Sequence, residues 1–566
     1  MNDQDSKLSQ EGPKAITLLA CALLLAMLIH GYFLAHLETY RGTYDAYTHI
    51  FFASKYKSLF NVVWVYNWFE GFELVSYPPL APQLIALVGR ITGLENAYIL
   101  VQLVAIAVVV TGAYRFCRLW SNPIPSAYAA FSASLMTSVA QQVHQFGQLP
   151  TCFACGLALH ASYHFAGWCS TGKTLRFIAA ALYLVTVALS HHLTFFLLIP
   201  VLLSLVWVTS FTSNFHNSEQ LRKCVTRGVF FVLVTAFLCI LSLYPFIDFV
   251  LHRLPPQLEI PHATRSNYFL NFSVLANFFI VPMASTCAGT LFLPILFLRQ
   301  PIYRPLILGF ILLAILGLGG STPIPKFIFG HYWSIFTFDR FAAWAALLLL
   351  PIMAWVFYSL KKTWIRMTIV AIQLAMLASY FHTLRGMKFQ PSPVDLRPAS
   401  HFLRAPENKS YRYLTLGLGS QLAKLSYMTS APTVDGLYFT ARTTKILRES
   451  GIESIDSAKY FGNSGKKVLD NFLAEPEKYS LRFVVVNDSY YEEVLKRFKW
   501  RRLQKTFGTL SIWETDRSVK PLPSQFFVKK SDTPAFFQVL WSFGVLSFFF
   551  ALIMELYLTR VHSHRT

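Results

Sequence analysis

Two ionisable residues four positions apart, Asp45 and His49, follow closely after the first long apolar segment of the chain. On a helix, residues at this spacing share one face. A positioned carboxylate can take a proton from a reacting hydroxyl group, and an imidazole titrates near neutral pH. The pair therefore indicates acid–base chemistry at the edge of an apolar segment. The structural alternative is that Asp45 caps a short helix and that His49 is solvated.

Other polar residues stand at the ends of apolar segments, where charge is costly and often functional. They are Tyr77 in SYPPLAP, His144 and Gln148 in HQFGQLP, His191 and His192 in SHHLT, and Asp339 and Arg340 in FTFDR. A guanidinium can hold a phosphate through forked hydrogen bonds, although an arginine at a membrane boundary can also reach toward water and pair with a neighbouring aspartate. Adjacent histidines seldom point the same way, so we expect at most one of that pair to face a site.

The segment that follows His49 is rich in aromatic residues. It contains Trp64, Trp68, Phe69 and Phe72. Such a belt is typical of a helix that lies in the membrane interface, so we predict an interfacial helix here. The dipeptide Pro78-Pro79 then predicts a turn back toward the membrane.

Composition places these residues in a membrane protein. The chain has 566 residues, of which 54% are hydrophobic and 14% are charged, and its mean hydropathy is +0.44. Soluble domains carry about 25% charged residues. Continuous apolar runs of membrane-spanning length recur from Ala15 to Leu384, and one more lies near the C-terminus. We therefore predict a polytopic α-helical membrane protein.

Hydropathy divides the chain into five parts. We predict a cytoplasmic N-terminus (1–14), a transmembrane core of about 11–13 spans (15–384) with a large first outer loop (38–78), an extracytoplasmic α/β domain (385–534), a final transmembrane helix (535–558) and a cytoplasmic tail (559–566). Segment 79–94 is short and contains two prolines, so we expect a half-helix or an interfacial helix there. A full crossing is the alternative.

The net charge of +21 does not indicate a nucleic-acid partner, because much of it lies in short Lys/Arg clusters beside the apolar segments. Such clusters are typical of cytoplasmic loops. If all of them are cytoplasmic, the polar motifs described above and the C-terminal domain share the opposite side. The eight cysteines all precede Arg299, so the predicted C-terminal domain needs no disulfide framework. The sequence has no P-loop, GxGxxG or HExxH motif.

Taken in order, the outer-loop Asp45 and His49, then SYPPLAP, GQLP and SHHLT, resemble the GT-C superfamily of glycosyltransferases, which use polyprenyl-phosphate-linked sugars. Within it, the chain is most similar to bacterial membrane proteins named "6-pyruvoyl-tetrahydropterin synthase-related", a name that does not describe their chemistry. The stretch from Leu481 to Thr515 predicts strand, helix, strand and strand. It is similar to the extracytoplasmic α/β domains that follow GT-C cores.

The resemblance implies transfer of a sugar from a polyprenyl-phosphate donor to an extracytoplasmic glycan, lipid or protein, in the inner or plasma membrane and in contact with its lipids. It implies that Asp45 is the general base, with inversion at the anomeric carbon. The substrate-binding candidates are His49, Tyr77, His144, Gln148, His191, His192, Asp339 and Arg340. Some members use a divalent metal, for which Asp45, His49 and His144 could form a partial site. The GQLP turn lacks the second acidic residue of several relatives, which puts a metal-dependent mechanism in doubt.

A transporter or flippase of a lipid-linked substrate is the alternative function, and a non-catalytic scaffold is a third. Transport predicts charged residues near mid-span and a pseudo-symmetric repeat. The mid-span regions of this sequence are largely apolar. A cavity that contains Asp45 and opens laterally to lipid would favour the enzyme, whereas a channel to the cytoplasmic face would favour transport.

Overall fold

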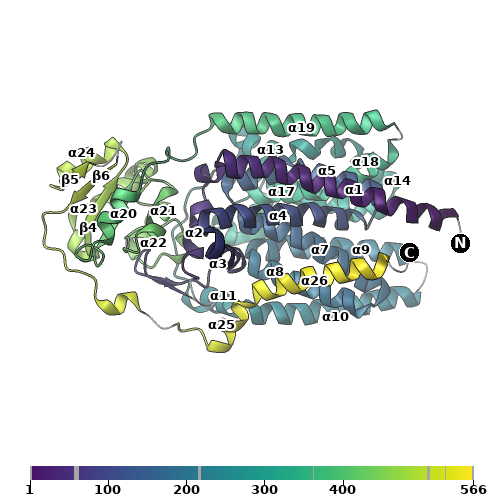
Figure 1. Cartoon of the computed structure of the whole chain (residues 1–566), viewed down its shortest axis with the longest axis horizontal. Helices are drawn as coiled ribbons and strands as arrows, with labels where there is room; N and C mark the ends of the chain where they lie inside the picture. Colours follow the sequence, from purple (N-terminus) through teal and green to yellow (C-terminus); the bar gives the residue numbers. More distant parts are fainter. Residues whose placement is uncertain are drawn as a thin grey trace.

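The computed structural model describes residues 3–56, 63–214, 218–360, 362–505, 510–528 and 531–563. A long bundle of helices is capped at one end by a smaller mixed domain, and both chain termini lie at the opposite end (Figure 1). We call these the domain end and the far end of the bundle. Residues 1–2 and 564–566 of the predicted terminal segments lie outside the described residues.

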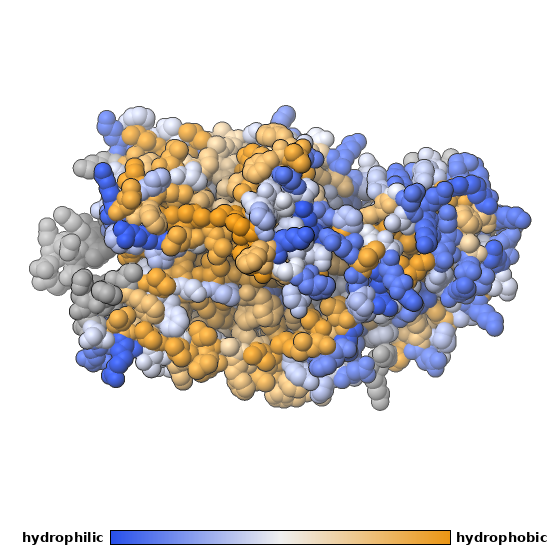
Figure 2. Space-filling model, turned by 180° about the vertical axis from the view of Figure 1, so that it is seen from behind, coloured by the Kyte–Doolittle hydropathy of each residue, from blue (hydrophilic) through white to orange (hydrophobic). Residues whose placement is uncertain are grey.

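The bundle surface is mainly hydrophobic, whereas the capping domain is mainly hydrophilic (Figure 2). Eight helical segments within the described ranges are long and apolar enough to cross a membrane. They are Gly12–His36, Leu94–Cys117, Thr194–Phe211, Ser218–Ser242, Phe272–Arg299, Asp339–Ser359, Thr363–Gly386 and Phe543–Arg560. The prediction of a multi-pass helical membrane protein with a C-terminal α/β domain is therefore confirmed.

Three shorter apolar helices, Leu80–Thr92, Thr174–Ser190 and Pro301–Gly317, accompany these eight within the described residues, and other apolar segments of the sequence form broken helices. The main bundle helices are α1 (Asp3–Gly31), α4 (Leu94–Cys117), α5 (Pro123–Ser134), α6 (Thr137–Gln141), α7 (Leu149–Thr171), α8 (Thr174–Ser190), α9 (Ile199–Asn214), α10 (Ser218–Ser242), α15 (Arg304–Gly317), α17 (Asp339–Leu348), α18 (Leu350–Ser359), α19 (Thr363–Gly386) and α26 (Phe543–Ser563). The predicted segment 124–143, for example, is interrupted between α5 and α6 at residues 135–136.

Helices α4, α7 and α8 pack together at the centre of the bundle. Two glycines let α4 and α7 approach closely: a Cβ on Gly112 would lie 2.6 Å from the carbonyl oxygen of Gly156, and a Cβ on Gly156 would lie 2.6 Å from the backbone of Val108. Small residues at such crossings are the usual way in which membrane helices pack.

The basic turns of the sequence gather at the far end. Arg227, on α10, donates to the carbonyl of Cys169 at the end of α7 (3.1 Å), and Trp120 donates to the carbonyl of Ile302 (3.3 Å). Arg115 forms an ion pair with Glu555 on the final helix (2.6 Å). Clusters that are distant in the sequence therefore share one end of the bundle, as the charge pattern predicts.

The first outer loop contains a short 3₁₀ turn (Thr39–Gly42), then α2 (Ala46–Ala53) and two short strands, β1 (Trp64–Val65) and β2 (Phe72–Glu73), which pair antiparallel. The predicted interfacial helix is therefore wrong. Phe69 adopts φ 57° and Gly71 adopts φ 83°, values that turn the chain and that a helix does not allow. The aromatic residues pack inward, since Trp68 is fully buried and stacks on Phe51 at 4.0 Å between ring centroids.

The short helix α3 (Leu80–Thr92) follows this loop and has 13 residues, about 20 Å, which is less than the thickness of a bilayer core. It does not cross the bundle. Glu95, just after its end, contacts Tyr427 and Lys424 of the capping domain at 2.6 and 2.9 Å. Both ends of α3 therefore lie at the domain end.

The C-terminal domain holds a four-stranded sheet in the order β3-β4-β6-β5, from Arg412–Leu416, Leu481–Val486, Ser511–Glu514 and Arg501–Lys505. Strands β3 and β4 are parallel and the other pairs are antiparallel. Helix α24 (Ser489–Arg497) follows β4, so the predicted strand–helix–strand–strand order is confirmed. Thr433 donates to the carbonyl of Asn67 (2.7 Å), which joins the domain to the first outer loop.

Candidate active site

Asp45 lies at the first turn of α2, at the domain end, and its side chain is only partly exposed. It occupies the N-cap position of α2, but its side chain makes no capping hydrogen bond, and its carboxylate has no hydrogen bond or ion pair with any described residue. Burial raises the pKa of Asp45 to about 7, against the opposing effect of the Arg340 charge and with smaller contributions from Glu453 and Asp339. A free carboxylate that titrates near neutral pH is well suited to act as a general base.

His49 supports Asp45 from one turn further along α2. Its Nε2 donates to the carbonyl oxygen of Gly147 (2.9 Å), and its Nδ1 accepts from the Tyr77 hydroxyl (2.6 Å). Because a carbonyl only accepts and Nδ1 is already occupied, the ring is the neutral Nε2–H tautomer. Burial lowers the pKa of His49 to about 4, which agrees with this state. His49 therefore has no free ring nitrogen for a ligand, and its hydrogen bond with Tyr77 helps to position the loop.

The GQLP turn lies between α2 and α17. Asp45 donates its backbone N–H to the carbonyl of Phe146 (3.0 Å). Gly147 adopts φ 73°, and a Cβ there would lie 2.6 Å from the Thr43 hydroxyl oxygen. Only glycine fits both the backbone angle and the contact. The next residue, Gln148, donates to Asp339 Oδ2 (2.9 Å), so one turn connects both acidic residues of the site.

Arg340 stands beside Asp339 at the start of α17, with Nη1 3.5 Å from Asp339 Oδ1. Its Nε donates to the Thr151 hydroxyl (3.4 Å) and its Nη1 to Thr337. Nη2 has no partner among the described residues. His191 donates from Nε2 to the same Thr151 hydroxyl (3.3 Å), since its Nδ1 accepts the backbone N–H of Thr194. The cluster thus presents a cation with a free N–H beside a hydroxyl group, which suits an anionic oxygen ligand.

Two candidates lie elsewhere. The ring nitrogens of His144 contact Thr39 (2.7 Å) and His30 (2.9 Å), so His144 faces α1. His192 points away from His191 and lies against Phe246, with 3.9 Å between ring centroids. The structure therefore brings together Asp45, His49, Tyr77, Gln148, His191, Asp339 and Arg340, and it leaves His144 and His192 outside.

Two residues near the site were not anticipated. Thr151 joins Arg340 to His191, and its place directly after the GQLP turn, three residues after Gln148, was the available signal. Glu453, from the C-terminal domain, carries a negative charge that acts on Asp45, and desolvation raises the pKa of Glu453 itself. No sequence pattern places a residue of that domain beside the first outer loop.

The one group of three metal-type ligands within 4.8 Å of one another, among the described residues, is His160, His164 and Glu555 near the far end. Arg176 donates to His164 Nδ1 (3.0 Å), so His164 Nε2 carries the proton and donates to Glu555 (2.6 Å). Arg115 holds the other oxygen of that carboxylate. This donor set does not fit a metal, which needs deprotonated nitrogens and a free carboxylate. It is an ion-paired contact between the final helix and the core.

The predicted partial metal site of Asp45, His49 and His144 does not form such a group among the described residues, because both histidines are hydrogen-bonded elsewhere.

By sequence the chain matches no known family model and no curated protein. Its structure is similar to three solved glycosyltransferases. It aligns with the mycobacterial arabinofuranosyltransferase AftD at a TM-score of 0.50 and 10% identity, covering 90% of this chain and 40% of AftD. It aligns with the oligosaccharyltransferase of Archaeoglobus fulgidus at a TM-score of 0.52 and 12% identity, covering 89% of this chain and 75% of that one. It aligns with ArnT from Cupriavidus metallidurans at a TM-score of 0.50 and 11% identity, covering 88% of this chain and 97% of that one. The chain thus spans only two fifths of the AftD chain.

The protein therefore has the fold of the GT-C membrane glycosyltransferases. The similarity extends over about nine tenths of this chain, so it includes both the helical bundle and the capping domain. The partly buried carboxylate of Asp45 and the guanidinium of Arg340 lie where the bundle meets that domain.

Proposed function

We propose that the protein is a membrane glycosyltransferase that moves a sugar from a polyprenyl-phosphate donor to an acceptor hydroxyl group. The observation that carries the proposal is the free, partly buried carboxylate of Asp45 beside the guanidinium of Arg340, at the domain end of a hydrophobic bundle. The acceptor is a glycan, lipid or protein outside the cytoplasm. The host membrane is the inner or plasma membrane, with the C-terminal domain on its outer face.

In the proposed reaction, Asp45 takes the proton of the acceptor hydroxyl group as its oxygen attacks the anomeric carbon. The bond from that carbon to the phosphate oxygen breaks, and the lipid phosphate leaves with the electron pair. Arg340 and Thr151 donate hydrogen bonds to the departing phosphate and so stabilise its charge. A single displacement inverts the anomeric configuration. General-base help of this kind contributes about 100- to 10,000-fold to the rate.

His49, Tyr77 and Gln148 act indirectly in this scheme. They hold the first outer loop and the start of α17 in place, which fixes the position of the base relative to the cation. A divalent metal bound with the donor phosphate is compatible with the scheme, and Asp45 and Asp339 are the carboxylates that could reach it. We further propose that the protein belongs to the bacterial membrane proteins named "6-pyruvoyl-tetrahydropterin synthase-related".

The test is transfer of radiolabelled sugar from a panel of polyprenyl-phosphate donors by the purified full-length protein. We expect Asp45→Asn to lower turnover at least about 100-fold while expression and thermal unfolding stay unchanged. Glu219→Gln, an exposed carboxylate in an i,i+4 pair on α10, is the matched control and should keep full activity. Normal turnover of Asp45→Asn would remove Asp45 from the mechanism. Movement of the lipid-linked sugar across vesicles without transfer would favour a flippase.

A further inference from the structure

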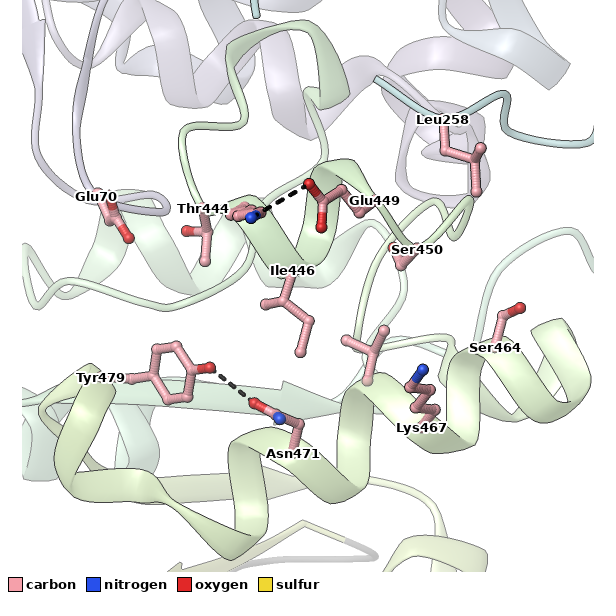
Figure 3. A pocket seen from close by; sticks show the side chains of 12 residues that line it. Glu70, Leu258, Thr444, Ile446, Glu449, Ser450, Ser464, Lys467, Asn471 and Tyr479 are labelled. Carbon is pink, nitrogen blue, oxygen red and sulfur yellow. Dashed lines mark hydrogen bonds and ion pairs between the residues drawn. The ribbon is translucent and has the colours of Figure 1, made fainter. Parts of the chain in front are cut away.

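A cavity of about 560 Å³ opens in the C-terminal domain, and its lining includes none of the active-site candidates. Helix α22 (Lys445–Arg448) forms one wall and α23 (Gly462–Ala474) forms another (Figure 3). Glu70 from the first outer loop and Leu258 from the loop that follows α11 (Tyr244–Asp248) and one further helical turn (Phe249–Arg253) complete the rim. Its volume lies within the usual range for small-ligand pockets.

Polar residues outnumber apolar ones in the lining of this cavity. Nine of its twelve residues carry polar side chains: Glu70, Thr444, Lys445, Glu449, Ser450, Ser464, Lys467, Asn471 and Tyr479. Most small-molecule pockets are lined mainly by apolar side chains. A wall that contains hydroxyl, amide and charged groups suits a ligand that itself carries many hydroxyl groups.

The charges of the lining balance. Lys445 and Glu449 lie 3.9 Å apart as a pair. Glu70 and Lys467 carry opposite charges, and neither side chain has a hydrogen-bond or ion-pair partner within the described part of the chain. A phosphate-rich ligand would require an excess of cations. The cavity therefore favours a neutral ligand that both accepts and donates hydrogen bonds.

Tyr479 and Asn471 provide an oriented recognition pair. The Tyr479 hydroxyl donates to Asn471 Oδ1 (2.7 Å), which leaves the Asn471 amide N–H groups to act as donors. The Tyr479 ring is half-buried and packs on Phe472 at 4.1 Å between centroids. Figure 3 shows Tyr479 and Asn471 facing Ile446 across the cavity. An aromatic surface next to hydrogen-bond donors matches the apolar face and the hydroxyl edge of a sugar ring.

The rim is held by contacts between chain segments distant in sequence. Leu258 donates its backbone N–H to the Arg448 carbonyl (2.7 Å). The backbone N–H of Glu70 donates to the Thr443 hydroxyl (3.3 Å). The first outer loop therefore contributes both the Asp45 carboxylate and one edge of the cavity. A ligand bound in the cavity would therefore contact the same loop that carries Asp45.

From this lining we infer that the cavity binds a short stretch of neutral saccharide, as a subsite for the acceptor chain. The inference rests on the proposed function only in naming that saccharide an acceptor, because binding itself needs no transfer. It adds a glycan-binding function to the C-terminal domain and narrows the acceptor from glycan, lipid or protein to glycan.

The experiment is calorimetric titration of the full-length protein in detergent with neutral gluco-, manno- and galacto-oligosaccharides of two to four units, and separately with inorganic phosphate. We expect saturable binding of at least one oligosaccharide and none of phosphate. Lys467→Ala and Asn471→Ala should each weaken binding about tenfold, the loss expected for one or two hydrogen bonds in a polar pocket. Lys466→Ala is the matched control, because Lys466 is the exposed neighbour on α23 and does not line the cavity.

The absence of saturable oligosaccharide binding would overturn the inference, and so would equal losses in Lys466→Ala and Lys467→Ala. Binding of phosphate in place of the sugars would also overturn it. Asp45→Asn separates this inference from the proposed function, since the variant should bind the oligosaccharide with unchanged affinity while it loses transfer. If the variant binds and still transfers, the proposed role of Asp45 fails and the saccharide subsite stands.

Discussion

The pH dependence of sugar transfer is the sharpest test of the role given to Asp45. A general base works only when ionised, so activity should rise as the pH rises through the pKa of this carboxylate. An ordinary aspartate is fully ionised by pH 6 and would give a flat profile above it. The structure places the pKa of Asp45 at about 7, because burial disfavours the charged form more than the Arg340 guanidinium favours it.

The size of the effect follows from that value. With a pKa of about 7, roughly a tenth of the carboxylate is ionised at pH 6 and roughly nine tenths at pH 8. We therefore expect kcat/KM to increase about tenfold between pH 6 and pH 8, with a limiting slope of about one below pH 6. The assay is initial-rate transfer of radiolabelled sugar in buffers of constant ionic strength, with thermal unfolding measured at each pH to confirm that the protein stays folded.

A second variant tests the electrostatic reasoning. Glu453 raises the pKa of Asp45 through like-charge repulsion, so Glu453→Gln should lower that pKa and move the acidic limb toward lower pH. Glu493→Gln, an exposed carboxylate of α24 paired with Lys496, is the control and should leave the limb in place. The reasoning is refuted if the wild-type profile is flat from pH 5.5 to 8.5, or if Glu453→Gln moves the limb to higher pH.

Three further variants test the supports of the site and of the bundle. Gly147→Ala should lower stability by about 2 kcal/mol or more and reduce transfer, because its Cβ would collide with Thr43 at a positive φ. Tyr77→Phe should cost about 1–3 kcal/mol, since it leaves a buried imidazole nitrogen without a donor. Glu555→Gln should cost about 3 kcal/mol by breaking the contact between the final helix and the core, while turnover per folded molecule is preserved.

Thermal unfolding in one detergent measures all three. Gly330→Ala is the control for Gly147→Ala, because Gly330 also has a positive φ (51°) but has no atom within 4 Å of the added Cβ. Gly330→Ala should therefore lower stability only by the cost of placing an alanine at a positive φ. Equal losses for the two glycines would show that the contact with the first outer loop carries no energy. A stability of Glu555→Gln equal to that of wild type would show that the carboxylate does not hold the final helix.

The sequence predicted the polytopic helical core and the small C-terminal sheet well. Long apolar runs can satisfy their backbone hydrogen bonds in lipid only as helices, so their presence determines the class of fold. The strand at Phe483 to Val486 and the helix after it were predicted equally well. β-Branched residues indicate the strand, and the change in hydrophobic periodicity after it indicates a helix.

The sequence was misleading where tertiary contacts override local pattern. The aromatic segment with Trp68 and Phe69 has the composition of an interfacial helix, yet it forms a hairpin whose rings pack on α2 and on the C-terminal domain. A buried environment for these rings, which is created by residues more than 350 positions away, outweighs the surface preference that composition suggests.

Composition and motif order thus determined the membrane class, the end of the bundle at which polar groups gather and the aspartate to test first. Only the tertiary structure decided which of the candidates share a site. His144 and His191 are equally plausible in sequence, but the side-chain directions on packed helices turn the first toward α1 and the second toward Thr151. The pKa of Asp45 likewise could not be predicted from the sequence, because it depends on the burial of the carboxylate and on nearby charges, including Glu453 from the C-terminal domain.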